Sequence, residues 1–319
     1  MEMLEKLSLA GIVPVIKVED AADAVPLCKA LADGGLPVAE ITFRSDAAEE
    51  AIRRVHDELP EVILGAGTVL TKDQVDRALN AGATYIVSPG LNPEIVKYCQ
   101  EKNVPILPGC GNPSDIEVAL SLGLKTVKFF PAEPLGGLKL IKAMAAPYGN
   151  VTFMPTGGIN ENNITEYLAF NKIVACGGSW MVPADAVAAK DWKRIEELTR
   201  SAVNKMLGLE LKHVGVNSGS PEKAQKDAEM IAKLLGWDLN DRGSKAIFVN
   251  DAFEVMKIPF RGEKGHIAIA CNSIKRARWH LERRGFEFDD ASASVKDGKL
   301  RAIYLKDDIA GFAFHLLQK

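Results

Sequence analysis

Short runs of β-branched and other apolar residues alternate with longer amphipathic stretches from the first residue to about residue 207. Such runs predict strands, and the stretches between them, such as AADAVPLCKALADGG and TKDQVDRALNAG, predict helices that end at glycine. The predicted strands are GIVPVI (11–16), VAEITF (38–43), VILGAG (62–67), TYIVSP (84–89), VPILPG (104–109), TVKFFP (126–131), VTFMPTGG (151–158) and IVACGG (173–178). Eight strand–helix repeats in about 200 residues predict an α/β fold, a (β/α)8 TIM barrel over residues 1–207.

Polar residues and glycines gather where the predicted strands end. These clusters are Glu40 to Arg44, Gly65 to Thr68, Ser88 to Gly90, Pro108 to Cys110, Lys128 to Glu133, Pro155 to Gly158 and Gly177 to Ser179. A single Gly-Gly pair is most simply a turn, but the carboxyl ends of barrel strands are where this fold builds active sites. Seven clusters at equivalent positions therefore favour a site at that face.

The pattern changes near residue 208, after a long predicted helix over 191–208. The rest of the chain contains two related halves of roughly 50 residues, each a strand, a helix and further strands. The first half comprises LKHVGVN, PEKAQKDAEMIAKLLG, AIFVN and AFEVMK; the second comprises GHIAIAC, SIKRARWHLERRG, AIYLKD and GFAFHLL. Two such halves can complete one sheet, so a smaller α+β domain is predicted over residues 208–319.

Composition narrows the function classes. Hydrophobic residues make up 47% and charged residues 25% of 319 residues, which is typical of a packed protein. A net charge of -3 without a basic block argues against nucleic-acid binding, and small-molecule chemistry is favoured. There is no apolar run of membrane-spanning length and no signal-peptide core, so we expect a cytoplasmic protein without a membrane partner. The five scattered cysteines predict reduced, mostly buried thiols.

Lys128 stands in the apolar run TVKFFPAE of the sixth predicted strand. Burial there would disfavour the ammonium form and lower its pKa, as an amine that attacks a ketone requires. The alternative is a lysine that snorkels to solvent at the strand end.

Glu40 and Arg44 follow each other at the end of the second predicted strand. Glu40 is a candidate general base or acid, and Arg44 a candidate for holding a substrate carboxylate in a fork geometry. The alternative is a surface ion pair between the two.

The segments PTGGI and GGSW end the last two predicted strands, where this fold commonly binds phosphate. Gly157, Gly158 and Gly178 would let backbone amides approach an anion, and a helix start after Gly158 would add a favourable dipole. These features predict a phosphorylated substrate.

Residues 1–206 resemble the 2-keto-3-deoxy-6-phosphogluconate (KDPG) and 4-hydroxy-2-oxoglutarate (KHG) aldolases. The segments that carry the resemblance are VPVI, AEITFRS, GAGTVL, SPGLNP, VKFFPAE, MPTGGI and GGSWMVPAD, in family order. The resemblance implies a homotrimeric barrel that needs no metal, in which Lys128 forms an imine with the 2-keto carbon and Glu40 moves protons. The products are pyruvate and glyceraldehyde 3-phosphate, or pyruvate and glyoxylate from KHG.

The same resemblance implies roles for further residues. Arg44 and Thr68 would face the substrate carboxylate, and Pro89 would line the pyruvate pocket. The phosphate site would comprise Gly157, Gly158, Gly178 and Ser179, and Thr156 and Ser179 resemble the gluconate-type members. Lys17 stands where some members carry a phosphate-facing arginine, and its role is left open.

His213 and His266 occupy equivalent positions in HVGV and HIAI, at the start of the two C-terminal halves. This pattern resembles the vicinal oxygen chelate superfamily, which includes glyoxalase I and whose paired βαβββ modules form a cup around a divalent metal. The matching ligand positions near the ends of the halves are Glu254 and His315. These nitrogen and oxygen donors suit zinc, iron, nickel or manganese. The alternative is a module that has lost its metal.

Three functions remain open for the whole chain. The leading hypothesis is a carbon–carbon lyase in the barrel, followed by a domain of unknown role. The second is a bifunctional protein whose C-terminal domain is a metal-dependent isomerase or dioxygenase. The third is a non-catalytic ligand-binding or assembly protein.

Overall fold

The computed structural model describes residues 2–319. The chain divides into two compact units, Met1–Met206 and Leu207–Lys319. We describe each unit by itself. Among the described residues, no helix is long and apolar enough to cross a bilayer. The five cysteines are all free and buried, which confirms the prediction of reduced thiols.

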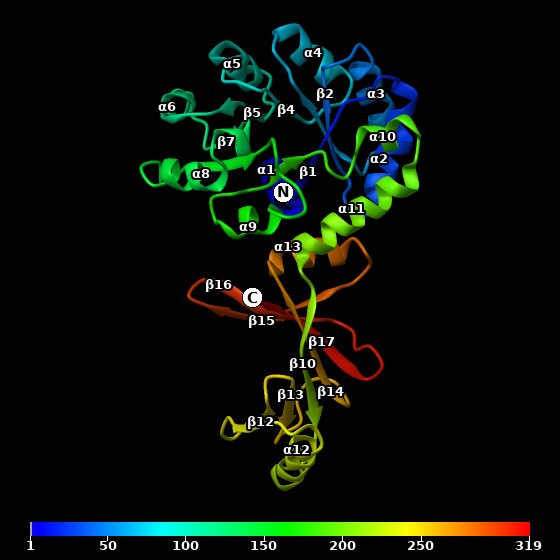
Figure 1. Cartoon of the computed structure of the whole chain (residues 1–319), viewed down its shortest axis with the longest axis vertical. Coiled ribbons are helices and arrows are strands. Elements are labelled where there is room, and N and C mark those ends of the chain that lie inside the picture. Colours follow the sequence, from blue (N-terminus) through cyan, green and yellow to red (C-terminus); the bar gives the residue numbers. More distant parts are fainter. Residues whose placement is uncertain (1) are drawn as a thin grey trace. The chain divides into compact units, whose positions relative to one another are not determined.

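Unit 1 is a barrel of parallel strands with helices outside it (Figure 1). Its strands are β1 (Ile12–Ile16), β2 (Val38–Thr42), β3 (Ile63–Gly67), β4 (Tyr85–Val87), β5 (Ile106–Leu107), β6 (Gly109–Cys110), β7 (Thr126–Phe129), β8 (Thr152–Pro155) and β9 (Cys176–Gly178). Its helices are α1 (Met3–Ala10), the 3-10 helix η1 (Ala21–Asp23), α2 (Ala24–Asp33), α3 (Ala48–Glu58), α4 (Lys72–Asn80), α5 (Pro93–Glu101), α6 (Pro113–Ser121), α7 (Ala132–Leu135), α8 (Gly137–Ala145), α9 (Ile164–Ala169), α10 (Ala184–Ala188) and α11 (Trp192–Leu207).

All eight predicted strands are confirmed, and together they close the barrel. One sheet has the order β5-β4-β3-β2-β1-β9 and the other β6-β7-β8. The fifth barrel strand is divided into β5 and β6 by Pro108, which has no backbone N–H to donate. Parallel bridges from Phe153 to Ile173 and from Thr156 to Gly177 join β8 to the chain around β9 and complete the ring.

Capping side chains fix the helix starts that follow β3, β4 and β6. Thr71, Asn92 and Asn112 each accept a hydrogen bond from a backbone N–H in the first turn of α4, α5 and α6. Pro93 and Pro113 occupy the first turns of α5 and α6, where a missing N–H costs nothing. The capping hydrogen bonds therefore fix the point at which each of these loops, which begin at the carboxyl end of a strand, enters the following helix.

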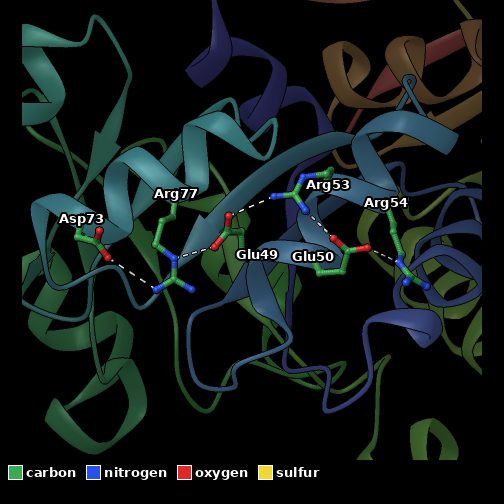
Figure 2. A network of polar contacts seen from close by, with 6 residues as sticks. All are labelled: Glu49, Glu50, Arg53, Arg54, Asp73 and Arg77. Atoms are coloured by element: carbon green, nitrogen blue, oxygen red, sulfur yellow. Dashed lines mark hydrogen bonds and ion pairs between the residues drawn. The ribbon is translucent and has the colours of Figure 1, made fainter.

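Charged side chains connect α3 to α4 on the outside of the barrel. Figure 2 shows the six residues of this network: Glu49, Glu50, Arg53, Arg54, Asp73 and Arg77. Glu49 accepts from Arg77 Nε at 2.7 Å across the two helices and from Arg53 at 3.1 Å within α3. Because these groups are partly exposed, we expect the network to contribute little to the stability of the barrel.

Unit 2 is one eight-stranded sheet built from two βαβββ halves, which confirms the predicted repeat. Its elements are β10 (Glu210–Asn217), α12 (Pro221–Leu235), β11 (Leu239–Asp241), β12 (Ala246–Val249), β13 (Phe253–Met256), β14 (Gly265–Cys271), α13 (Ile274–Glu282), β15 (Phe288–Lys296), β16 (Lys299–Leu305) and β17 (Phe312–Gln318). The strand order is β11-β12-β13-β10-β14-β17-β16-β15, so the two halves meet at the antiparallel pair β10 and β14. The Val214–Ile267 pair lies at the centre of this symmetric arrangement.

The two faces of the unit 2 sheet differ. Helix α12 packs its buried alanines on Ile247, Val249 and Val255. Because side chains alternate along a strand, Phe248 and Met256 point to the opposite face, where they form a separate buried cluster with Ala246. One face is therefore covered by a helix, and the other carries the groups described below.

A glycine in β3 makes room for the buried Tyr85 ring. A Cβ at Gly65 would lie 2.2 to 2.5 Å from three atoms of that ring. We expect Gly65→Ala to lower the stability of unit 1 by about 1 to 3 kcal/mol, because the core would be overpacked. Differential scanning calorimetry measures the change. The matched control is Gly149→Ala, where nothing lies within 4 Å of the added carbon, and an equal fall in both variants would contradict the prediction.

Candidate active site

Lys128 and Glu40 face each other inside the barrel. Lys128 is 5% exposed and Glu40 is 0% exposed. The Lys128 Nζ atom lies 3.5 Å from Glu40 Oε1, while Glu40 Oε2 is buried and makes no hydrogen bond to the described residues. The structure thus brings two residues 88 positions apart into one amine–carboxylate pair, in which the second carboxylate oxygen has no partner among the described residues.

The backbone around the pair explains why both side chains fit. Lys128 donates its backbone N–H to Pro108 O at 3.0 Å, which fixes β7 against the fifth barrel strand. A Cβ at Gly67 would lie 2.3 Å from Glu40 Oε1, so only glycine leaves space for the carboxylate at that position. The Tyr85 hydroxyl is buried nearby, and burial, followed by the Glu40 charge, raises its pKa well above the usual value.

Two alternatives from the sequence are wrong. Lys128 does not snorkel, because its side chain is buried beside Glu40. Glu40 and Arg44 do not form a surface ion pair: Glu40 is fully buried, whereas Arg44 is exposed and donates from Nε to Thr42 Oγ1 at 3.0 Å. The Thr42 hydroxyl in turn donates to Ile16 O at 2.8 Å. Two successive hydrogen bonds thus connect the Arg44 side chain to the end of β1.

Thr68 and Pro89 follow the paired ends of β3 and β4. Phe43 donates its backbone N–H to Gly67 O at 2.8 Å, which places the start of the Arg44 loop beside Thr68. Thr68 has φ 56°, a left-handed conformation that costs energy for a threonine and is found at functional sites. A Cβ at Gly109 would lie 1.9 Å from Pro89 O, so the Pro89 loop closely approaches the fifth strand.

The ends of β7, β8 and β9 meet on the other side of the barrel mouth. Ala132 N donates to Thr156 O at 2.8 Å, and Glu133 N donates to Gly157 O at 3.0 Å. The Thr156–Gly177 bridge then brings Gly178 and Ser179 alongside. The Thr156 hydroxyl is buried and has no hydrogen-bond partner among residues 2–319, so it is available to a ligand.

The expected helix start after Gly158 is wrong. Helix α9 begins at Ile164 and is six residues long. Asparagine turns occupy the intervening segment, because Asn160 and Asn163 both donate from Nδ2 to Gly158 O at 3.1 Å. An anion at Gly158 would therefore meet loop amides and not the end of a helix.

Lys17, Phe130 and Trp180 had no definite role assigned from the sequence. Lys17, at the end of β1, is exposed and forms an ion pair with Glu19 at 2.5 Å. The Phe130 ring lies 5.2 Å from Lys128 Nζ. Trp180 packs on Gly178, and its indole N–H is buried without a partner among the described residues. Both aromatic residues lie in segments that carry the family resemblance, VKFFPAE and GGSW. In GGSW, a large aromatic residue directly after small ones could have indicated a role for Trp180.

In unit 2 the four residues singled out from the sequence converge on the helix-free face of the sheet. His213 Nε2 lies 3.2 Å from His266 Nε2, and Glu254 Oε2 lies 3.2 and 3.1 Å from these two nitrogens. Ring nitrogens of His213, His266 and His315 all lie within 4.8 Å of one another. The His266 Nδ1 atom and both ring nitrogens of His315 are buried without hydrogen-bond partners in the described part of the chain.

Strand register produces this cluster. Glu254 pairs with Gly215 on β10, and His315 pairs with Ala268 on β14. A Cβ at Gly215 would lie 2.1 Å from the His266 ring, so glycine is needed opposite that histidine. Tyr304 stacks on His315 with ring centroids 4.5 Å apart and fixes its orientation. Gly215 and Tyr304 were not recognised from the sequence.

The charge states in this cluster follow from burial and from the neighbouring groups. Burial raises the pKa of the Glu254 carboxyl, but hydrogen bonds from His213 and His266, together with their charges, outweigh it and lower that pKa to about 2. Burial, followed by the charges of His266 and His213, lowers the pKa of His315 to about 3. Near neutral pH, Glu254 is therefore ionised and His315 is neutral.

Comparisons with known proteins match unit 1. The family model for KDPG and KHG aldolase matches residues 3–198. A 2-dehydro-3-deoxy-phosphogluconate aldolase of Haemophilus influenzae is 51% identical over 203 residues, 64% of this chain and 96% of that protein. A KHG/KDPG aldolase of Escherichia coli K12 is 45% identical over 197 residues, 62% of this chain and 92% of that protein.

Solved structures show the same similarity. A KDPG aldolase from Legionella pneumophila, with pyruvate captured at low pH as a covalent carbinolamine intermediate, superposes with a TM-score of 0.61 at 35% identity, covering 63% of this chain and 98% of that one. A KDPG aldolase of Zymomonas mobilis ZM4 with 3-phosphoglycerate gives a TM-score of 0.58 at 42% identity, covering 62% and 94%.

The barrel and its relatives define an aldolase, a carbon–carbon lyase. The chain belongs to the KDPG and KHG aldolase family, through a match that lies in unit 1.

Proposed function

We propose that unit 1 is a class I aldolase that cleaves KDPG to pyruvate and glyceraldehyde 3-phosphate, with Lys128 as the nucleophile. The observation that carries the proposal is the buried Lys128 Nζ atom 3.5 Å from Glu40 Oε1. An amine and a proton carrier at this distance are the minimum that imine chemistry requires. The covalent pyruvate adduct of the Legionella relative supports the same chemistry.

Imine formation comes first. The unprotonated Lys128 amine attacks C2 of the substrate, and the ketone oxygen takes up a proton to give a carbinolamine. Loss of that hydroxyl as water, with proton transfer through Glu40, gives a protonated imine. The imine withdraws electrons from C3 and therefore supplies the electron sink that a metal ion supplies in other enzymes.

Cleavage follows from the same pair. Glu40 takes the proton of the C4 hydroxyl, the C3–C4 bond breaks, and its electrons form an enamine while the aldehyde leaves. Glu40 then returns the proton to C3, and water hydrolyses the imine to release pyruvate and the amine. One carboxylate can serve each step because its second oxygen has no protein partner.

The rim residues fit the two ends of this substrate. Arg44 and Thr68 would bind the carboxylate, and Pro89 would line the pocket of the pyruvate portion. At the opposite side, Gly157, Gly158, Gly178 and Ser179 would bind the phosphate, with Thr156 contributing its free hydroxyl. The 3-phosphoglycerate in the Zymomonas relative is a ligand with the same two anionic ends.

We also propose cleavage of KHG to pyruvate and glyoxylate, because both substrates pass through the same imine. The ratio of kcat/KM values for the two substrates tests this second activity. The homotrimer implied by the family resemblance stays a prediction, which light scattering of the purified protein measures.

We further propose that unit 2 binds one divalent cation through His213, Glu254, His266 and His315. Three imidazoles and one carboxylate are donors that suit zinc and other transition metals. Both ring nitrogens of His315 are buried without partners among the described residues, and a coordinated cation would satisfy one of them. These residues therefore fit a metal site.

The imine mechanism predicts a covalent mark on one residue. Borohydride with pyruvate should add the mass of a reduced pyruvate adduct to the peptide that contains Lys128. Lys128→Ala should lose this label and lower kcat by roughly 10⁴- to 10⁶-fold, because the nucleophile is gone. Lys125→Ala is the control, since that lysine is exposed on the same segment. Unlabelled Lys128 in active, pyruvate-saturated protein would refute the mechanism.

Glu40 is tested by its isostere. We expect Glu40→Gln to lower kcat by about 10²- to 10⁴-fold, because an amide of the same shape cannot carry the proton. Peptide mapping should still find the borohydride label on Lys128, since the amine remains. Glu58→Gln, at an exposed position of α3, is the control. If steady-state kinetics give the same kcat for Glu40→Gln and the parent enzyme, the assignment of Glu40 is wrong.

The metal proposal is tested by elemental analysis after loading with Zn²⁺ and desalting. We expect one ion per chain, and a loss of affinity in His266→Ala beyond the roughly 10- to 100-fold typical of outer-shell substitutions. Gly215→Ala should also weaken binding, because its Cβ would displace the His266 ring without removing a donor. His56→Ala, at an exposed histidine of α3, should have no effect. Equal zinc content in all four proteins would argue against the site.

A further inference from the structure

The loop of unit 1 that is proposed to bind phosphate contains two adjacent glycines, Gly157 and Gly158, and is called the glycine loop below. Their φ values are 100° and 84°, in a region that glycine adopts readily. Two such residues do not fix a loop by themselves, because each has many accessible conformations. The position of the glycine loop therefore depends on the residues that contact it.

Glu133, in α7, contacts both residues of the glycine loop. Its backbone N–H donates to Gly157 O at 3.0 Å. Its side chain lies against Gly158, where an added Cβ would be 2.5 Å from Glu133 Cβ and 2.6 Å from Glu133 Cγ. A change in the position of the Glu133 side chain would therefore release the loop on this side.

Tyr167, in α9, holds the Glu133 side chain. Tyr167 is 2% exposed, and its hydroxyl donates to Glu133 Oε1. Burial, followed by the hydrogen bond to Glu133 and the charge of that carboxylate, raises the pKa of the Tyr167 hydroxyl above its usual value, so the donor keeps its proton near neutral pH. Gly137 leaves room for this hydrogen bond, since a Cβ there would lie 2.8 Å from Glu133 Oε1 and 2.9 Å from the Tyr167 hydroxyl oxygen.

Asn163 connects the start of α9 to the glycine loop at a second point. Its side chain donates from Nδ2 to Gly158 O at 3.1 Å, and its backbone oxygen accepts from the Tyr167 N–H at 3.2 Å. Gly158 is therefore held from α9 in two ways, directly by Asn163 and through Glu133 by Tyr167.

We infer that the hydrogen bond between Tyr167 and Glu133 determines the preference of unit 1 for a phosphorylated substrate. It fixes the glycine loop in the conformation that binds the phosphate, so Tyr167 and Glu133 are positioning residues. A binding loop that is already ordered loses less entropy when its ligand binds, and its affinity is higher for that reason. This inference rests on the proposed function, in which Gly157 and Gly158 contact the phosphate.

The imine chemistry does not require these two residues. Among residues 2–319, neither Tyr167 nor Glu133 forms a hydrogen bond with Lys128 or Glu40. Loss of the Tyr167–Glu133 hydrogen bond should therefore affect the phosphate end of the substrate and leave the reacting carbons unaffected.

The test compares KDPG with 2-keto-3-deoxygluconate, the same sugar acid without its phosphate. In Tyr167→Phe, kcat/KM for KDPG should fall about tenfold, mainly through KM, because a hydrogen bond to a carboxylate is lost and the loop is no longer ordered before binding. For the unphosphorylated acid, kcat/KM should change less than about twofold, since this substrate has no group for the glycine loop.

Exchange of the pyruvate methyl hydrogens in D₂O, followed by NMR, reports on Lys128 and Glu40 without any phosphate. Pyruvate reaches the enamine through the same imine, and Glu40 returns the proton to C3. Tyr167→Phe should therefore exchange at the rate of the parent enzyme. This measurement separates a positioning role from a general loss of barrel structure.

Variants of Glu133 test the other end of the hydrogen bond. Because Glu133 is exposed, Glu133→Ala removes the acceptor without emptying the core, and it should reproduce the effect of Tyr167→Phe. Glu133→Gln should retain most of the preference, since its amide oxygen can still accept from Tyr167. Tyr148→Phe is the matched control, because the Tyr148 hydroxyl also donates to a glutamate, Glu117 Oε1 at 3.0 Å, at an exposed position.

The outcomes distinguish the inference from the proposed function. If the parent enzyme cleaves both acids with equal kcat/KM, the phosphate contact of the glycine loop is contradicted and the inference fails with it. If the parent enzyme prefers KDPG, and Tyr167→Phe and Glu133→Ala keep that preference, the inference is overturned and the proposed function stands. A fall in pyruvate exchange equal to the fall in KDPG cleavage also overturns it, because the hydrogen bond would then support the whole barrel.

Discussion

The buried contact between Lys128 and Glu40 is the constraint on which the architecture of unit 1 depends. An unpaired charge in a protein interior costs several kcal/mol, and removing one member of a buried pair is strongly destabilising. Each residue therefore requires the other at a short distance, although 88 positions separate them. The closed barrel brings the second and sixth strands to face each other across its interior, and Gly67 supplies the space that the carboxylate fills.

Unit 2 reaches a similar concentration of polar groups by symmetry. Each half contributes one histidine from its first strand and one donor from its last, and the antiparallel pair β10 and β14 places the two sets together. Gly215 leaves space for the His266 ring, as Gly67 leaves space for the Glu40 carboxylate. In both places an added Cβ would overlap a buried polar side chain. The glycine is specified by its neighbour in space and not by a turn.

The strands of the barrel and the position of its rim were predictable from the sequence, because buried strands are visible as runs of apolar residues. The eight barrel strands are buried apolar runs, and strand ends with polar residues marked the rim. Two strands of unit 2 were not identified individually, Leu239–Asp241 and Phe288–Lys296. Both lie at the edges of the sheet and are largely exposed, so they lack the apolar alternation that marks a half-buried strand.

The side-chain contacts were less predictable, for a physical reason. The Asn160 and Asn163 side chains replace a helix start after Gly158, and nothing local distinguishes asparagines that form a turn from asparagines that cap a helix. The stacking of Tyr304 on His315 depends on the order of the strands that carry the two rings. A single sequence gives periodicity within an element, whereas these contacts arise between elements.

The two units also differ in how far their buried polar groups are paired. In unit 1 the amine and the carboxylate satisfy each other's charge, and the remaining Glu40 oxygen is free for a proton or a substrate hydroxyl. In unit 2 three imidazoles and one carboxylate supply more lone pairs than protons, and the buried His315 ring has no hydrogen-bond partner among the residues described. A pair of opposite charges is complete without an added ion, but converging electron-pair donors are not. The two sites therefore differ in kind: unit 1 holds a nucleophile beside a proton carrier, and unit 2 holds a set of converging donors that fits the proposed cation.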